Sequence, residues 1–162
     1  MLRDKNLVPL SRQHQHALAL CVRLDRALQS GQVELDAWQS EIQALFEQEI
    51  GTHFSAEEEV LFPAAGRYPQ LAVIVEELRG EHQALRDLFR RAGSRQLGKP
   101  DLSALAETLT NHVRKEERVL FEGMQKAMSA TELAQLGRRL DGLLERTACI
   151  LPSEATKLRP RK

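Results

Sequence analysis

HFSAEEEVLF, at residues 53–62, has a close repeat in HVRKEERVLF, at residues 112–121. Six positions are the same in both copies: the histidine, two consecutive glutamates and the closing Val-Leu-Phe. In each copy a glutamate follows four residues after the histidine, a spacing that stacks the two side chains on one helix face, about one turn apart. An imidazole and a carboxylate on the same inward face, provided twice, indicate a two-metal site between helices.

The remaining composition argues against nucleic acid and membrane as partners. Lysine plus arginine and aspartate plus glutamate both number 23, so no net field attracts a polyanion or an anionic membrane. No apolar run reaches membrane length, and the opening MLRDKNLVPL lacks the apolar core of a signal peptide, so we expect a cytoplasmic protein. Cys21 and Cys149 form no metal-type CxxC pair, and we expect both to be buried apolar thiols.

Helix formers dominate the chain and the alternation typical of strands is missing, so we predict helix throughout. The first predicted helix has its N-cap at Ser11 and ends near Gly31, and the second is capped by Asp36 and stopped by Pro63. The third starts near Pro69 and ends before Gly93, and the fourth is capped by Asp101. A capping box, Ser129-x-x-Glu132, begins a shorter fifth helix. Short connections between long amphipathic helices predict an all-α fold, an up-down antiparallel four-helix bundle with a short additional C-terminal helix. Residues 1–150 are predicted to form one domain, and the polar residues 151–162 a flexible tail.

Each half of the chain carries one further histidine within an apolar stripe, His14 in the first half and His82 in the second. His16 is the alternative to His14, although it lies about 200° away around the helix. Burying so many polar groups is costly unless each is satisfied, and two metal ions would satisfy them all. The candidate ligands are His14, His53, Glu57, His82, His112 and Glu116.

The neighbouring acidic residues leave alternatives open. Glu117 could replace Glu116 as a ligand; otherwise Glu58 and Glu117 are solvated or support the ligands. Glu49 and Glu81 are candidates for holding ligand imidazoles from behind. Imidazole combined with carboxylate suits iron or manganese, with zinc as a possible substitute. Six side chains cannot saturate two octahedral ions, so positions would remain open for a small ligand.

These segments resemble the hemerythrin-like, or HHE cation-binding, family, which has a di-iron four-helix bundle. The resemblance covers roughly residues 7–145 and rests on LSRQHQHAL (10–18), HFSAEEEVLFP (53–63), GEHQALRDL (80–88) and HVRKEERVLF (112–121). It implies that the six candidate residues bind two iron ions, and that Glu57 and Glu116 bridge them.

The chain departs from the oxygen carriers that it resembles. Carriers place a second histidine one turn from the third-helix ligand, where this chain has Leu78 and Arg86, and an aspartate five residues after the last histidine, where it has Glu117. These departures argue against reversible oxygen carriage. They favour a protein that binds O2, NO or peroxide for sensing or stress protection, acting through a partner protein. Ferroxidase or peroxide-reducing activity, and iron storage or delivery of the iron–sulfur cluster repair type, are the alternatives.

Overall fold

The computed structural model describes residues 1–148, and the side chains of residues 1–145, and within this range every regular element is helical. The elements are α1 (Val8–Ser30), α2 (Leu35–Leu45), η1 (Phe46–Ile50), α3 (Gly51–Ala56), η2 (Glu57–Leu61), α4 (Phe62–Gly66), α5 (Pro69–Gly93), α6 (Lys99–Lys115), η3 (Glu116–Leu120), α7 (Phe121–Ala127) and α8 (Ala130–Ala148). The all-α prediction is confirmed. The predicted tail at 151–162 and Cys149 lie outside the described residues.

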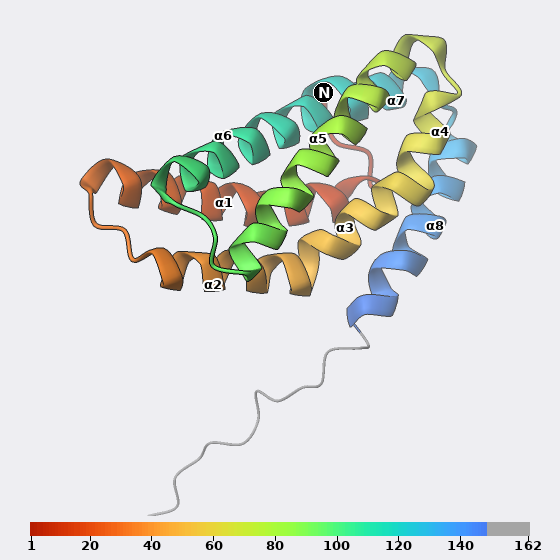
Figure 1. Cartoon of the computed structure of the whole chain (residues 1–162). Helices are drawn as coiled ribbons and strands as arrows, with labels where there is room; N and C mark the ends of the chain where they lie inside the picture. The colour runs from red at the N-terminus through yellow and green to blue at the C-terminus, as the bar shows by residue number, and fades with distance from the viewer. Residues whose placement is uncertain (149–162) are drawn as a thin grey trace, which may run out of the picture.

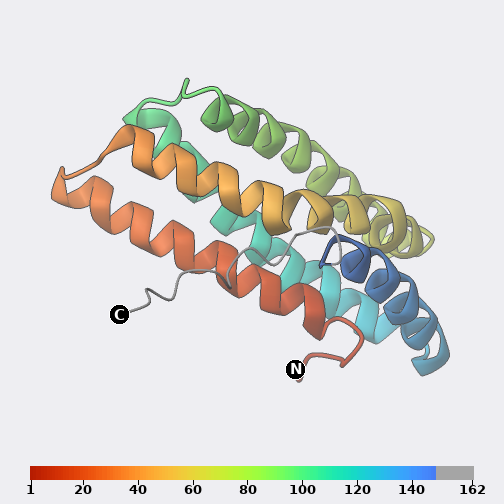
Figure 2. The same ribbon diagram turned by 90° about the horizontal axis from the view of Figure 1, so that it is seen from below.

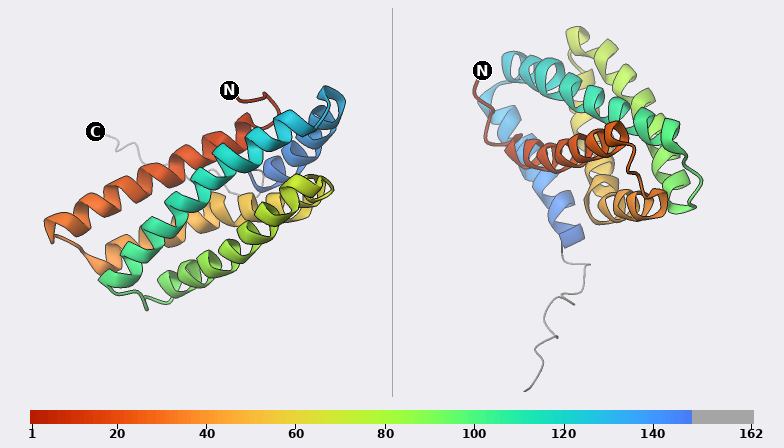
Figure 3. Two further views of the ribbon diagram at one scale, coloured as in Figure 1. Left: turned by 90° about the horizontal axis from the view of Figure 1, so that it is seen from above. Right: turned by 90° about the vertical axis from the view of Figure 1, so that its left-hand side faces the viewer.

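The three η segments are π-helical turns that join neighbouring α-helices without a break. Residues 35–66 and 99–127 are therefore each one long helical stretch, which packs beside α1 and α5 in a bundle (Figure 1). α1 packs on α6, and α5 packs on both α2 and α6. α8 packs along α3 and η2, at the end of the bundle where the N-terminus lies (Figures 2 and 3). No helix within residues 1–148 is long and apolar enough to cross a bilayer.

Several predicted helix ends are confirmed. Gly31 ends α1 with a left-handed φ of 74°, and its N–H donates to Leu28 O at 3.2 Å. The capping box before α8 is present, because Ser129 N–H donates to a Glu132 carboxylate oxygen at 2.8 Å and Glu132 N–H to Ser129 Oγ at 3.3 Å. α5 begins at Pro69 as predicted, although it includes Gly93.

The predicted caps at three helix starts were wrong. α1 begins at Val8, three residues before Ser11, and α2 begins at Leu35, one residue before Asp36. Asp101 lies within the first turn of α6, where its carboxylate accepts the N–H of the N-cap residue Gly98 at 3.0 Å. In α1 a proline occupies the first turn, where its missing N–H costs no hydrogen bond.

Pro63 does not end the second helical stretch, which continues to Gly66. The π turn η2 precedes it, and there Phe62 N–H donates to Glu57 O, five residues back. The wider turn restarts the α-helix at Phe62, so Pro63 occupies a first-turn position that needs no N–H donor. The predicted stop was wrong because a π turn cannot be read from the apolar periodicity.

The apolar core has two parts. The α8-side core contains Leu10, Leu61, Leu78, Leu120 and Leu136 among others, and the loop-side core contains Leu24, Ile42, Leu85, Leu105 and Cys21 among others. Cys21 is 1% exposed, as predicted for a core thiol. In α1 and α5 the switch from one core to the other occurs at His14 and His82, and in the other two long stretches it occurs just after His53 and His112. The polar residues therefore form a layer between two apolar cores.

The packing of α8 makes a testable prediction at two of its glycines. A methyl group at residue 137 would lie 2.7 Å from Asn6 Cβ, which the backbone holds in place, whereas a methyl group at residue 142 would meet nothing. We expect Gly137→Ala to destabilise the protein, since overpacking costs about 1–3 kcal/mol. Gly142→Ala should stabilise it by up to about 1 kcal/mol through helix propensity. Chemical denaturation measures both, and equal effects would contradict the docking of α8 on the N-terminal segment.

Candidate metal centre

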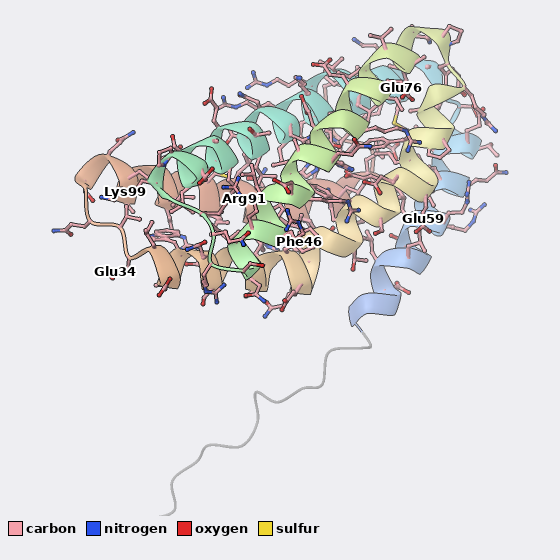
Figure 4. All side chains as sticks on the ribbon, viewed as in Figure 1. Glu34, Phe46, Glu59, Glu76, Arg91 and Lys99 are labelled. Atoms are coloured by element: carbon pink, nitrogen blue, oxygen red, sulfur yellow. The ribbon has the colours of Figure 1, made fainter. Side chains whose placement is uncertain are left out.

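The structure brings all six predicted ligand residues together in the layer between the two cores. Most charged side chains of the bundle lie outside, as Glu34, Glu76 and Lys99 do (Figure 4). In contrast, Glu57 and Glu116 have no exposed surface, and the four histidines are between 1% and 4% exposed. Four helical stretches supply them: His14 from α1, His53 and Glu57 from α3 and η2, His82 from α5, and His112 and Glu116 from α6 and η3.

The donor atoms form two groups that share both glutamates. One group is His14, His53, Glu57 and Glu116, and the other is His82, His112, Glu57 and Glu116; within each group the donor atoms lie within 4.8 Å of one another. We call the two groups the His14–His53 half and the His82–His112 half.

Each glutamate directs one oxygen toward each half. Glu57 Oε1 lies 3.0 Å from His53 Nε2, and its Oε2 lies 3.3 Å from His82 Nε2. Glu116 Oε2 lies 3.0 Å from His14 Nε2, and its Oε1 lies 3.3 Å from His112 Nε2. Both carboxylates are therefore oriented to contact two cations at once.

Each imidazole forms a hydrogen bond through its Nδ1 atom, on the side that faces away from the cluster. The acceptor oxygen belongs to Glu117 for His14 at 2.6 Å, Gln13 for His53 at 2.7 Å, Glu58 for His82 at 2.8 Å and Glu81 for His112 at 2.9 Å. A carboxylate or amide oxygen only accepts, so each Nδ1 carries a proton, and each imidazole, when neutral, directs the Nε2 lone pair inward. This tautomer is the one that binds metal through Nε2.

The inward nitrogens face one another at close range. His14 Nε2 lies 3.0 Å from His53 Nε2, and His82 Nε2 lies 3.1 Å from His112 Nε2. No oxygen of Glu57 or Glu116 receives a hydrogen bond within the described residues. Lone pairs that converge in a buried space need positive charge between them. The residues present therefore fit divalent metal ions.

The pKa shifts show the same demand for positive charge. Burial opposes the charged form of His112, but Glu116 outweighs it and raises the pKa of that imidazole to about 10. Burial likewise opposes a charge on His14, but Glu116 and Glu117 beside it raise its pKa well above the usual value. Burial and repulsion from Glu57 raise the pKa of Glu116, yet His112 and His14 lower it to about 2. Without metal, protons take the place of the cations.

Both inward glutamates begin a π turn. Glu57 opens η2 and Glu116 opens η3, and the N–H five residues later, on Phe62 or Phe121, donates to the glutamate carbonyl. The extra residue brings each phenylalanine back to the interior one wide turn after the glutamate. Phe62 then packs on His82 with ring centroids 5.2 Å apart, and Phe121 stacks on His14 at 5.6 Å. The duplicated phenylalanines thus help to orient two imidazoles.

The residues proposed as alternatives lie outside the cluster. The side chain of His16 is 60% exposed and pairs with Glu49 at 2.9 Å, so Glu49 does not support a buried imidazole. Glu117 lies behind His14 and also accepts the Ser11 hydroxyl at 2.7 Å. Glu81 lies behind His112, as predicted.

Sequence reasoning missed Gln13 and left the role of Glu58 open. The duplication points to Glu58 and Glu117, because they occupy the same position in the two copies. Glu58 accepts a hydrogen bond from His82, and Glu117 accepts one from His14. Gln13 has a weaker signal: it lies directly before His14 as Glu81 lies before His82, but it is an amide and not a carboxylate.

A small cavity adjoins the cluster. Its volume is about 10 Å³, which suits about one water-sized molecule. His14, His53 and His112 border it on the polar side together with Gln13. The rest of its lining is apolar, formed by Ala17, Ile50, Phe54, Leu109 and Val113. A cavity of this volume accepts a molecule about as small as water.

Comparison with known proteins gives one family. A family model described as Hemerythrin HHE cation binding domain matches residues 8–124, a range that includes all six residues of the cluster. No curated protein and no solved structure matches the chain.

Metal should stabilise the folded protein, because cations relieve the repulsion among the buried lone pairs. With ferrous ion at about 100 times its Kd, we expect the melting temperature of the metal-free protein to rise by about 5–10 °C under anaerobic conditions. His14→Ala should reduce this rise, and His16→Ala, which removes the exposed histidine two residues away, should not. Equal rises in the two variants would contradict the position of His14 in the centre.

Proposed function

The chain belongs to the hemerythrin HHE cation-binding domain family, and from this premise we propose that its two halves bind a pair of iron ions that take up O2, NO or peroxide. Glu57 and Glu116 are proposed to bridge the ions, with two imidazoles completing the protein ligands of each. The observation that carries the proposal is the sharing of both glutamates by two His-His groups.

The donor set supports iron over other metals. Imidazole binds iron, zinc, copper and nickel, and carboxylate shifts the preference toward harder ions such as iron and manganese. Two imidazoles and two shared carboxylates give each ion at most four protein donors in a monodentate arrangement. An octahedral ion then keeps positions for exogenous ligands. When bound, two ferrous ions supply open positions and electrons to a small oxidant.

The adjoining cavity supports a diatomic ligand. It touches imidazoles of both halves, and its apolar lining favours an uncharged guest such as O2 or NO. Its volume is too small for an organic substrate. The side chains that line it include no lysine, tyrosine or cysteine that could act as a nucleophile. These features favour ligand binding, with sensing or protection as the biological outcome and a partner protein as the recipient of the signal.

The proposal includes the up-down antiparallel order of the four long helical stretches. The pairing of α1 with α6 and of α5 with α2 and α6 supports it, as do the short connections between successive stretches. In this arrangement the ligands of all four stretches meet at one level of the bundle.

The first test is the stoichiometry of iron. Elemental analysis after anaerobic reconstitution should give about two ions per chain, as the ligand number and type imply. Glu116→Ala should lower this to one or none, because the bridging carboxylate serves both ions. Glu117→Ala is the comparison variant and, with iron in excess, should still bind two ions, since that carboxylate contacts His14 from the outer side and not the shared donor group. Normal binding by Glu116→Ala and loss in Glu117→Ala would show that the bridge is assigned to the wrong residue.

The second test concerns the fate of oxygen. We expect the ferrous protein to oxidise in air within seconds to minutes, because only one histidine of α5 reaches the centre, and to bind NO in the same form. Leu78 is completely buried one turn before His82, so Leu78→His should supply the missing imidazole and slow the oxidation. Val73→His, which adds an exposed histidine to the same helix, is the control. Stopped-flow absorbance measures the rates. A spectral change in the natural protein that lasts for hours and reverses under vacuum would favour oxygen carriage.

A further inference from the structure

The residues behind the four imidazoles follow the duplication of the sequence. Glu58 and Glu117 each lie five residues after the histidine of their own copy, and each accepts the Nδ1 hydrogen of the histidine on α5 or α1. Gln13 lies directly before His14 on α1 and accepts the Nδ1 hydrogen of His53. Glu81 lies directly before His82 on α5 and accepts that of His112. The four outer partners are therefore two pairs of equivalent residues.

One position breaks this equivalence. Glu58, Glu81 and Glu117 are carboxylates, whereas Gln13 is a neutral amide. Each of the three carboxylates also forms an ion pair with a basic side chain: Glu117 with Arg3 at 2.6 Å, Glu58 with Arg86 at 3.2 Å, and Glu81 with Lys115. The neutral amide of Gln13 forms no such pair. Among the four ligand histidines, His53 alone is held by an uncharged group.

The type of outer partner changes the strength of an imidazole as a ligand. A carboxylate draws the Nδ1 proton more strongly than an amide does, and this makes the opposite nitrogen a better electron donor. The paired cations cancel much of the carboxylate charge at longer range, so the effect acts through the hydrogen bond itself. His53 is therefore the weakest of the four nitrogen donors.

The weak donor borders the cavity. Both histidines of its half, His14 and His53, line the cavity together with Gln13, whereas in the other half His112 does so and His82 does not. Gln13 is partly exposed, so the cavity wall nearest His53 adjoins the protein surface. An ion that leaves or changes its ligands has space beside it on this side.

We propose that the two halves bind metal with unequal affinity, and that Gln13 sets the difference. The His82–His112 half fills first, and the His14–His53 half holds the more weakly bound, exchangeable ion. This inference rests on the proposed two-metal function. It identifies Gln13 as a positioning residue that acts through His53.

The order of filling is measured directly by nuclear magnetic resonance of the full chain, labelled with ¹⁵N at histidine and titrated with Zn²⁺ as a diamagnetic probe. The imidazole signals of His82 and His112 should shift during the first equivalent, and those of His14 and His53 during the second. Simultaneous shifts, or the reverse order, would overturn the inference. Failure to bind a second ion would overturn the two-metal function itself, and so the two failures are distinguishable.

The role of Gln13 is tested by making the halves alike. Gln13→Glu should raise the affinity of the second binding step about tenfold or more and leave the first unchanged, in anaerobic titration calorimetry with Fe²⁺. Gln15→Glu adds the same charge at an exposed position of the same helix and should change neither step. Unchanged affinity in Gln13→Glu, or an equal effect of Gln15→Glu, would contradict the assignment.

The reciprocal change keeps the test decisive if Gln13→Glu folds poorly. Glu81→Gln gives His112 the same amide partner that His53 has, so the first step should weaken about tenfold or more and the order of filling should disappear. Retention of the natural order in Glu81→Gln would show that the outer partners do not control the affinity of the two halves.

Discussion

Inside the bundle, four imidazole nitrogens and two carboxylates direct their lone pairs toward the same small volume. The outer hydrogen bonds fix the imidazoles in the tautomer that cannot donate inward, so the histidines cannot relieve the carboxylates while they stay neutral. A buried anion without a partner costs several kcal/mol on the usual scale for protein interiors. Positive charge at the centre is thus a condition for the folded layer, and either protons or metal ions can supply it.

The surrounding architecture meets this condition from both sides. Two apolar cores lie on either side of the polar layer and shield it from bulk solvent, which strengthens the electrostatic contacts inside. The π turns at Glu57 and Glu116 let each helix direct a carboxylate inward and then return a phenylalanine to the core. Charged residues just outside the layer, such as Arg3 on Glu117, fix the partners that orient the imidazoles. Binding chemistry and stability therefore depend on the same few contacts.

The sequence predicted the cluster because its strongest signal is local. His53 and Glu57 must share a helix face at a spacing of four residues, and the second copy repeats the constraint, so their convergence needed only the packing of these helices in one bundle. Features that depend on tertiary contact were not predictable in this way. Ser11 resembled a cap but donates to Glu117, and Pro63 resembled a stop but follows a π turn. The sequence does not show that Gln13 reaches His53, because the two residues lie on different helices and meet only in the folded bundle.

Anomalous diffraction at the iron absorption edge, from crystals of the iron-loaded protein, would locate the two ions. We expect two anomalous peaks per chain in the buried layer, one within bonding distance of His14 and His53 and one of His82 and His112, with Glu57 and Glu116 contacting both. A single peak, or peaks confined to the surface acidic residues, would contradict this expectation.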